Sequence, residues 1–98
     1  MKKYSVKELR EFLQTLDKTM IVTVEGIQEV HVNFSDEYVC FDNQIIDEND
    51  SVFKELTVDF LIELLSVCES TCTIVVCGVE MISARVDGNF VILDDSEE

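Results

Sequence analysis

The chain has 98 residues, 47% of them hydrophobic, and a formal net charge of −14. This length suits one domain with its own core, whereas no apolar stretch approaches the roughly 20 residues that span a bilayer. The acidity disfavours direct binding to nucleic acid or to an anionic membrane, both of which select basic surfaces. It permits binding to a basic partner, and the alternative is that it only keeps an abundant protein soluble. Because no apolar segment follows Lys2 and Lys3 as in a secretory signal, we expect a cytoplasmic protein.

The first predicted element is a helix that begins after Ser5. Ser5 and Glu8 have the spacing of a capping box, in which each side chain accepts a hydrogen bond from the other residue's backbone N–H. Apolar residues then recur at helical spacing, at Val6, Leu9, Phe12, Leu13 and Leu16. One face of this helix should therefore lie on the core.

Three strands are predicted after this helix. Residues 20–24 and 30–34 alternate between apolar and polar side chains, which is typical of half-buried strands, and Gly26 marks the turn between them. A turn at Ser35-Asp36 leads into a third strand over residues 38–42. Residues 43–55 read as an acidic loop, whose ends we expect to be attached to the core by Ile45, Ile46, Val52 and Phe53.

The second half of the chain repeats this order. Thr57 caps a helix with an apolar face of Val58, Leu61, Leu64, Leu65 and Cys68. Three further apolar residues on its other faces, Phe60, Ile62 and Val67, indicate a helix that is more enclosed than the first or that contacts a partner. Strands are predicted at residues 73–77, 81–86 and 90–93, with a hairpin turn at Asp87-Gly88.

A shift of 52 residues aligns residues 4–42 with residues 56–94 without a gap. Nine positions are identical: Val6/Val58, Leu9/Leu61, Glu11/Glu63, Leu13/Leu65, Thr19/Thr71, Val24/Val76, Gly26/Gly78, Val39/Val91 and Asp42/Asp94. We interpret this as a tandem duplication of an α-β-β-β unit within one domain, residues 1–98. The predicted fold class is α+β, with two helices on one face of antiparallel sheet structure and a pseudo-twofold axis. A joined six-stranded sheet, which protects the edges, is favoured over two packed layers.

Few residues could carry chemistry. His31 is the only histidine, and the strand alternation places it on the polar face beside Glu29, so we expect a solvated side chain. Cys68, Cys72 and Cys77 lack the paired Cys-x2-Cys spacing of a zinc site, and Cys72 and Cys77 would face opposite sides of a strand. The three glycines are isolated at turns and form no phosphate-binding loop. We therefore expect a non-enzymatic protein with no metal and no cofactor.

The acidic residues are the remaining feature, and they gather after equivalent strands. One cluster (Asp42, Asp47, Glu48 and Asp50) follows the third strand, and another (Asp94, Asp95, Glu97 and Glu98) follows the last strand. Alternate residues of a strand are roughly 6.5–7 Å apart, so a sheet can hold carboxylates in a phosphate-like array. The predicted partner-binding residues are Asp36, Glu37, Asp42, Asp47, Glu48, Asp50, Asp94 and Asp95. The alternative is a solvated acidic face that binds nothing, together with a frayed tail over residues 94–98.

In size and acidity the chain resembles small phage-encoded inhibitors, including the anti-CRISPR proteins that mimic DNA. The resemblance covers size and composition. It implies an inhibitor that occupies the nucleic-acid-binding surface of a basic partner protein. The alternative is a structural or interaction module that uses apolar contacts of the second helix, for example as a twofold homodimer. A small enzyme or metal protein is a third hypothesis, since sites can be assembled from residues that are far apart in sequence.

Overall fold

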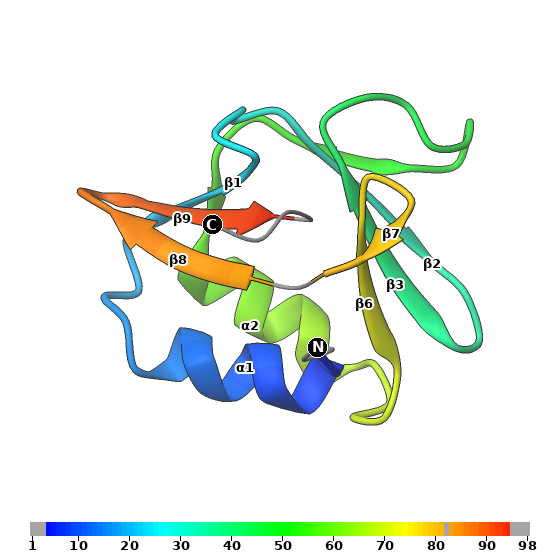
Figure 1. Ribbon diagram of the computed structural model, residues 1–98, viewed down its shortest axis with the longest axis horizontal. Helices are drawn as coiled ribbons and strands as arrows, with labels where there is room; N and C mark the ends of the chain where they lie inside the picture. The colour runs from blue at the N-terminus through cyan, green and yellow to red at the C-terminus, as the bar shows by residue number, and fades with distance from the viewer. Residues whose placement is uncertain (1–3, 82, 95–98) are drawn as a thin grey trace.

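The computed structural model describes residues 4–81 and 83–94, which form two helices and nine short strands (Figure 1). In chain order the elements are α1 Val6–Gln14, β1 Ile21–Val24, β2 Val30–Phe34, β3 Tyr38–Asp42, β4 Ser51–Phe53, β5 Leu56–Thr57, α2 Val58–Ser66, β6 Thr73–Val76, β7 Val79–Glu80, β8 Ser83–Asp87 and β9 Phe90–Asp94. The strands make one sheet in the order β5-β1-β9-β8 and another in the order β4-β2-β3-β6-β7. The fold is therefore α+β, with two mixed sheets of mostly antiparallel strands.

Both helices begin at the predicted caps. Ser5 Oγ accepts from the Glu8 N–H at 3.2 Å, and Glu8 Oε1 accepts from the Ser5 N–H at 3.1 Å, which confirms the capping box. Thr57 Oγ1 accepts from the Phe60 N–H at 3.2 Å. The two helices pack against each other, and in Figure 1 they lie side by side below strands β1, β9 and β8. No helix among the described residues has the length and apolar character needed to cross a membrane.

The sheet arrangement differs from the predicted antiparallel, joined sheet. β1 runs parallel to β9, from the Ile21–Phe90 pair to the Val24–Leu93 pair, and β3 runs parallel to β6. Each sheet thus combines strands from both halves of the chain. Local periodicity could not reveal this, because it tells which face of a strand is buried and not which strand lies beside it.

Burial explains why β1 leaves its sequence neighbour. β1 lies between β5 and β9, where Val22, Thr23 and Val24 are all buried. The Thr23 hydroxyl donates to the Val91 carbonyl at 3.0 Å, which satisfies a polar group inside the sheet. After β1 the turn at Gly26 closes with a single bridge, Val24 to Ile27, and the chain then passes to the other sheet as β2.

Many backbone contacts recur at the 52-residue offset. The Val6 N–H donates to the Cys72 carbonyl at 2.8 Å, and the Val58 N–H donates to the Met20 carbonyl at 2.9 Å. The two parallel pairs have corresponding registers, since Ile21 lies opposite Phe90 as Thr73 lies opposite Tyr38. The antiparallel pairs β2–β3 and β8–β9 correspond in the same way.

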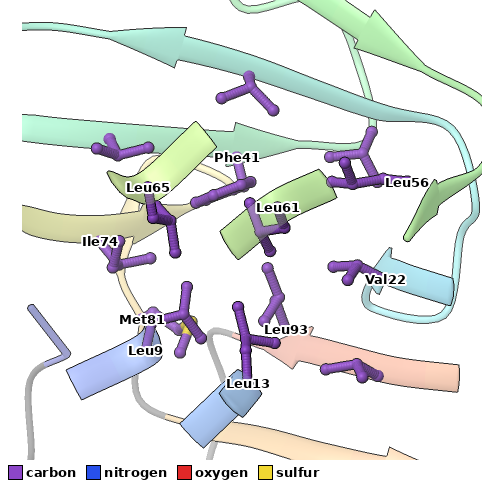
Figure 2. Packing of buried hydrophobic residues seen from close by; sticks show 14 of the residues in the cluster. Leu9, Leu13, Val22, Phe41, Leu56, Leu61, Leu65, Ile74, Met81 and Leu93 are labelled. Atoms are coloured by element: carbon purple, nitrogen blue, oxygen red, sulfur yellow. The ribbon is translucent and has the colours of Figure 1, made fainter. Parts of the chain in front are cut away.

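One hydrophobic core joins all of these elements. Figure 2 shows side chains from both helices and both sheets meeting in it: Leu9, Leu13, Val22, Phe41, Leu56, Leu61, Leu65, Ile74, Met81 and Leu93. Each of these side chains is fully buried. The two sheets therefore depend on the same set of apolar contacts for their stability.

The connection over residues 43–55 is not a simple loop. It contains strand β4, which pairs with β2, and Phe53 from β4 packs on the core. Its ring lies edge-on to Phe60 of α2, with 5.5 Å between ring centroids. The expected attachment through Ile45, Ile46 and Val52 is wrong, because all three side chains are exposed.

The prediction of a more enclosed second helix is also wrong for two of its three residues. Phe60 is exposed, and Val67, just past the end of α2, is 85% exposed. Only Ile62 packs against the core, where it is partly buried. The other half of that prediction, contact with a partner, is taken up below.

Candidate binding surface

The turn between β2 and β3 carries two of the predicted acids, Asp36 and Glu37, and both are exposed. The Ser35 N–H donates to the Tyr38 carbonyl at 2.9 Å, and the Tyr38 N–H donates to Ser35 Oγ at 3.2 Å. The Glu37 carbonyl accepts from the Thr73 N–H at 2.9 Å. Hydrogen bonds therefore fix the backbone on both sides of the turn that carries the Asp36 and Glu37 carboxylates.

A groove of about 340 Å³ lies between this turn and the loop that joins α2 to β6. Its lining consists of Phe34, Ser35, Asp36, Val39, Val67, Cys68, Glu69 and Cys72. A second hollow of about 200 Å³ shares Asp36, Glu69 and Cys72 with it and adds Glu37, Tyr38, Thr71 and Thr73. The two hollows are thus adjacent. We call their combined surface the acidic groove.

The acidic groove has a particular chemistry. Its charged residues are Asp36, Glu37 and Glu69, and no lysine or arginine lines it. Its exposed apolar side chains are Phe34, Tyr38 and Val67. A long cationic side chain suits this combination, since its ammonium or guanidinium group can bind a carboxylate while its methylene stem lies on apolar surface.

Three of these residues were missed by the sequence reasoning as site residues. Glu69 is not among the predicted residues, because one acid among 21 gives no signal in the sequence. The alternation of residues 30–34 predicts that Phe34 lies on the same face as Val30 and Val32, but unlike them it is exposed. Tyr38 begins the next strand and is also exposed. The signal that could have found the site was the position of an aromatic residue on each side of an acidic turn.

The acidic loop after β3 is organised around Asp50. Its carboxylate accepts from the Ile46 N–H at 2.6 Å, from the Asp47 N–H at 3.0 Å and from Asn33 Nδ2 at 3.0 Å. Burial acts to raise the pKa of Asp50, but these hydrogen bonds outweigh it and hold the pKa below its ordinary value. Asp50 therefore stabilises the loop, while Asp47 and Glu48 are exposed.

His31 is not the solvated side chain that the alternation predicted, since only 4% of it is exposed. Its Nε2 lies 2.9 Å from Glu29 Oε2, and its Nδ1 lies 3.5 Å from Asp50 Oδ2 without a hydrogen bond. Pairing of β4 with β2 places Val52 opposite His31. Strand β4, which lies in the segment predicted to be an acidic loop, therefore covers the outer edge of β2.

Asp42 ends β3 and is half-buried beside Cys77. Its Oδ1 accepts from the Gln44 N–H at 3.1 Å and lies 3.6 Å from Cys77 Sγ. Burial, and then the negative charge of Asp42, raise the pKa of Cys77 to about 12. Burial likewise raises the pKa of Cys40 and of Cys68. These thiols are consequently protonated at neutral pH and are poor nucleophiles.

Asp94 occupies the corresponding place at the end of β9, but its surroundings differ. It is buried, and its Oδ2 accepts from Arg85 Nη1 of the neighbouring strand at 2.7 Å. It therefore does not present a carboxylate to a partner. Asp95, together with Glu97 and Glu98, lies outside the described residues.

The structure thus brings the predicted site residues together only in part. Asp36 and Glu37 lie at one end of β3, whereas Asp47 and Glu48 follow its other end, and these four are exposed. Glu37 and Asp42 are five positions apart, which corresponds to roughly 16 Å of strand. Asp42, Asp50 and Asp94 are engaged within the protein. Of the two acidic patches expected at equivalent strand ends, the structure allows a comparison of Asp42 and Asp94 alone, and these two have different partners.

Within residues 4–81 and 83–94, no three His, Cys, Asp or Glu side chains are gathered so that they could hold a metal ion. No family model, no curated protein and no solved structure matches the chain. The functional argument accordingly rests on the chemistry of the surface.

Proposed function

We propose that this chain is a non-enzymatic, cytoplasmic protein that binds a basic partner protein and blocks it by charge mimicry. The partner is of the nucleic-acid-binding class, whose basic surfaces are shaped to hold phosphates. The acidic groove is the observation that carries the proposal. Three carboxylates and three exposed apolar side chains line it, from the turn between β2 and β3 and from the loop between α2 and β6, and no lysine or arginine does.

Binding begins with the acidic groove as an anchor. Lysine or arginine side chains of the partner place their charged groups against Asp36, Glu37 and Glu69. Their stems lie on Phe34 and Val67, and an arginine can also stack on an aromatic ring. Charge-assisted hydrogen bonds of this kind are stronger than neutral ones, and the apolar contacts exclude water around them.

The second group of exposed acids, Asp47 and Glu48, supports the groove from the other end of β3. Charges at this distance act on the approach of the partner more than on the final contact. Their effect is expected mainly in the association rate, which should fall as salt screens them.

A triple charge reversal tests this proposal. The groove variant carries Asp36→Lys, Glu37→Lys and Glu69→Lys, and the control variant carries Glu11→Lys, Glu55→Lys and Glu63→Lys at exposed positions elsewhere. Both have the same net charge. Each protein is used to capture partners from host lysate at low salt, and the captured protein is then assayed for nucleic-acid binding. The proposal predicts a captured protein whose nucleic-acid binding is blocked by the wild type and the control variant. Equal capture by the groove variant would contradict it.

The second candidate function is an interaction module that uses apolar contacts near the second helix. The 85% exposure of Val67 favours it, since an isolated valine at the rim of a groove is available to a partner. Phe60 contributes less because its ring already contacts Phe53. In this case Val67→Asp should abolish partner capture, and the complex should resist high salt.

We also propose that the chain is a tandem duplication of an α-β-β-β unit with a pseudo-twofold axis. The recurrence of backbone bonds and strand registers at the 52-residue offset supports this. The turns support it as well, since Glu25 and Cys77 both adopt positive φ, at 54° and 52°, before a glycine. Single domains built in this way keep the pairing scheme while the surface of each copy diverges.

A further inference from the structure

The outer edge of β8 is unpaired in the part of the chain that the structure describes. β8 is the last strand of its sheet and pairs only with β9. Every residue from Arg85 to Phe90 is exposed. An edge of this kind offers a row of backbone donors and acceptors to another strand.

β2 shows how the same kind of edge is covered in the other half. β2 pairs with β3 in the register in which β8 pairs with β9, since His31 lies opposite Asp42 as Ser83 lies opposite Asp94. On its other side β2 is paired with β4, through Val30, His31 and Val32. The edge of β2 that pairs with β4 thus corresponds to the unpaired edge of β8.

The hairpin geometry determines which backbone groups of β8 face outward. A two-residue turn, Gly88-Asn89, joins β8 to β9 and makes Asp87 and Phe90 the first bonded pair. In an antiparallel pair alternate residues exchange hydrogen bonds, so Arg85 and Asp87 direct their N–H and C=O toward β9. Ala84 and Val86 consequently direct theirs to the free edge.

We infer that a second copy of the chain occupies this edge, with the two β8 strands antiparallel and centred on Val86. In this register Val86 exchanges two backbone hydrogen bonds with the partner's Val86. Arg85 then lies opposite the partner's Asp87, and by the twofold symmetry Asp87 lies opposite the partner's Arg85. A register centred on Arg85 would instead place two arginines directly opposite each other, which is unfavourable.

The charge on β8 favours a second copy over a basic partner. The strand carries one cation, Arg85, and one anion, Asp87, in a protein whose net charge is −14. Arg85 is the only Lys or Arg in residues 55–98. One of its nitrogens binds Asp94, and the guanidinium has further N–H groups for the partner's Asp87. This edge is therefore a place where two acidic chains can meet without like charges in contact.

The dimer has a salt dependence opposite to that of the proposed function. Added salt screens the repulsion between two copies of charge −14 and should strengthen the dimer. The same salt weakens binding to a basic partner. The acidic groove belongs to the other sheet, so the dimer would present two grooves to a partner with repeated basic sites. The dimer does not depend on that function.

Sedimentation equilibrium with charge-reversed pairs tests the inference. At moderate salt the wild type should dimerise, and Asp87→Arg and Arg85→Asp should each raise the dimer dissociation constant by roughly tenfold or more. Their equimolar mixture should form a heterodimer as tight as the wild-type dimer, since each positive residue then meets a negative one. A wild type that is monomeric at millimolar concentration in high salt would overturn the inference, as would a mixture no tighter than its components.

A second variant is needed because Arg85→Asp also loses the hydrogen bond to Asp94 and could weaken dimerisation by destabilising the fold. Val86→Pro removes one outward N–H and leaves the bonds between β8 and β9 in place, a substitution that edge strands tolerate. This variant should keep the circular dichroism spectrum of the wild type and sediment as a monomer. A folded Val86→Pro dimer would contradict the assigned edge.

Discussion

Residues 4–42 and 56–94 make corresponding backbone contacts, yet their surfaces differ at most exposed positions. In the first half β4 covers the edge of β2, and His31 is buried beneath the acidic loop. In the second half the edge of β8 is bare, and Arg85 binds the buried Asp94. The comparison teaches that the apolar positions determine how the strands pair, whereas the proposed functions reside in the positions where the halves diverge.

The largest expected effect comes from the core that both halves share. Phe41→Ala in β3 and Leu93→Ala in β9 truncate corresponding, fully buried side chains. Phe41→Ala should lower the free energy of unfolding by about 3–5 kcal/mol and Leu93→Ala by about 2–5 kcal/mol. Urea denaturation measures both, with the exposed Val67→Ala as a control that should change stability by less than about 0.5 kcal/mol. Stability unchanged by either core variant would break the claim of one shared core.

A smaller loss is expected where the halves differ in charge. Arg85→Ala removes the charged partner of Asp94, which has no equivalent at Asp42. Because Arg85 is half-exposed, we expect a loss of about 1–2 kcal/mol. The matched change of Asn33→Ala, at the corresponding position in β2, loses a hydrogen bond to Asp50 and should cost less. Equal losses, again from urea denaturation, would show that the charge contributes nothing.

Asp50 provides a test of the acidic loop. Its pKa is lower in the folded state, so its ionised form stabilises the fold above the unfolded pKa of about 3.9, and this stabilisation is lost as the pH falls through the folded pKa. Asp50→Asn should therefore be less stable than the wild type at pH 7, with the difference vanishing in strong acid. Hydrogen exchange should show loss of protection at the Ile46 and Asp47 amides. A stability difference independent of pH would contradict this account.

The smallest effect concerns thiol reactivity. With a pKa of about 12, Cys77 should react very slowly with iodoacetamide in the folded protein at pH 8 and rapidly in urea. Asp42→Asn removes a nearby negative charge and should increase the rate modestly. Peptide mapping by mass spectrometry measures the labelling. Fast labelling of native Cys77 would show that it is neither buried nor close to Asp42.

Much of the local structure could be predicted from the sequence. The caps at Ser5 and Thr57 and the apolar helix faces form as predicted. The hairpin between residues 83 and 94 also forms, but its turn lies at Gly88-Asn89, one residue later than the predicted Asp87-Gly88. These features depend on residues within a few positions of one another, where spacing is informative. The parallel pairing of β1 with β9 depends instead on packing between the ends of the chain, and spacing within a strand carries no information about it.

The candidate site was predictable only in part for the same reason. The exposed turn of Asp36 and Glu37 follows from its position between two strands. The burial of His31 requires Val52 and Asp50, about twenty residues further along the chain, and the burial of Asp94 requires Arg85 on the adjacent strand. The acidic groove joins that turn to Val67 and Glu69, which belong to the other half of the chain.

The most direct test of the central claim is a competition titration on the partner protein captured by the wild type. Labelled nucleic acid is bound to the purified partner, and the wild type, groove variant or control variant is added at several salt concentrations. The account predicts that the wild type and the control variant displace the nucleic acid equally, less well as salt rises, while the groove variant fails to displace it. Displacement by all three proteins, or by none, would contradict charge mimicry through the acidic groove.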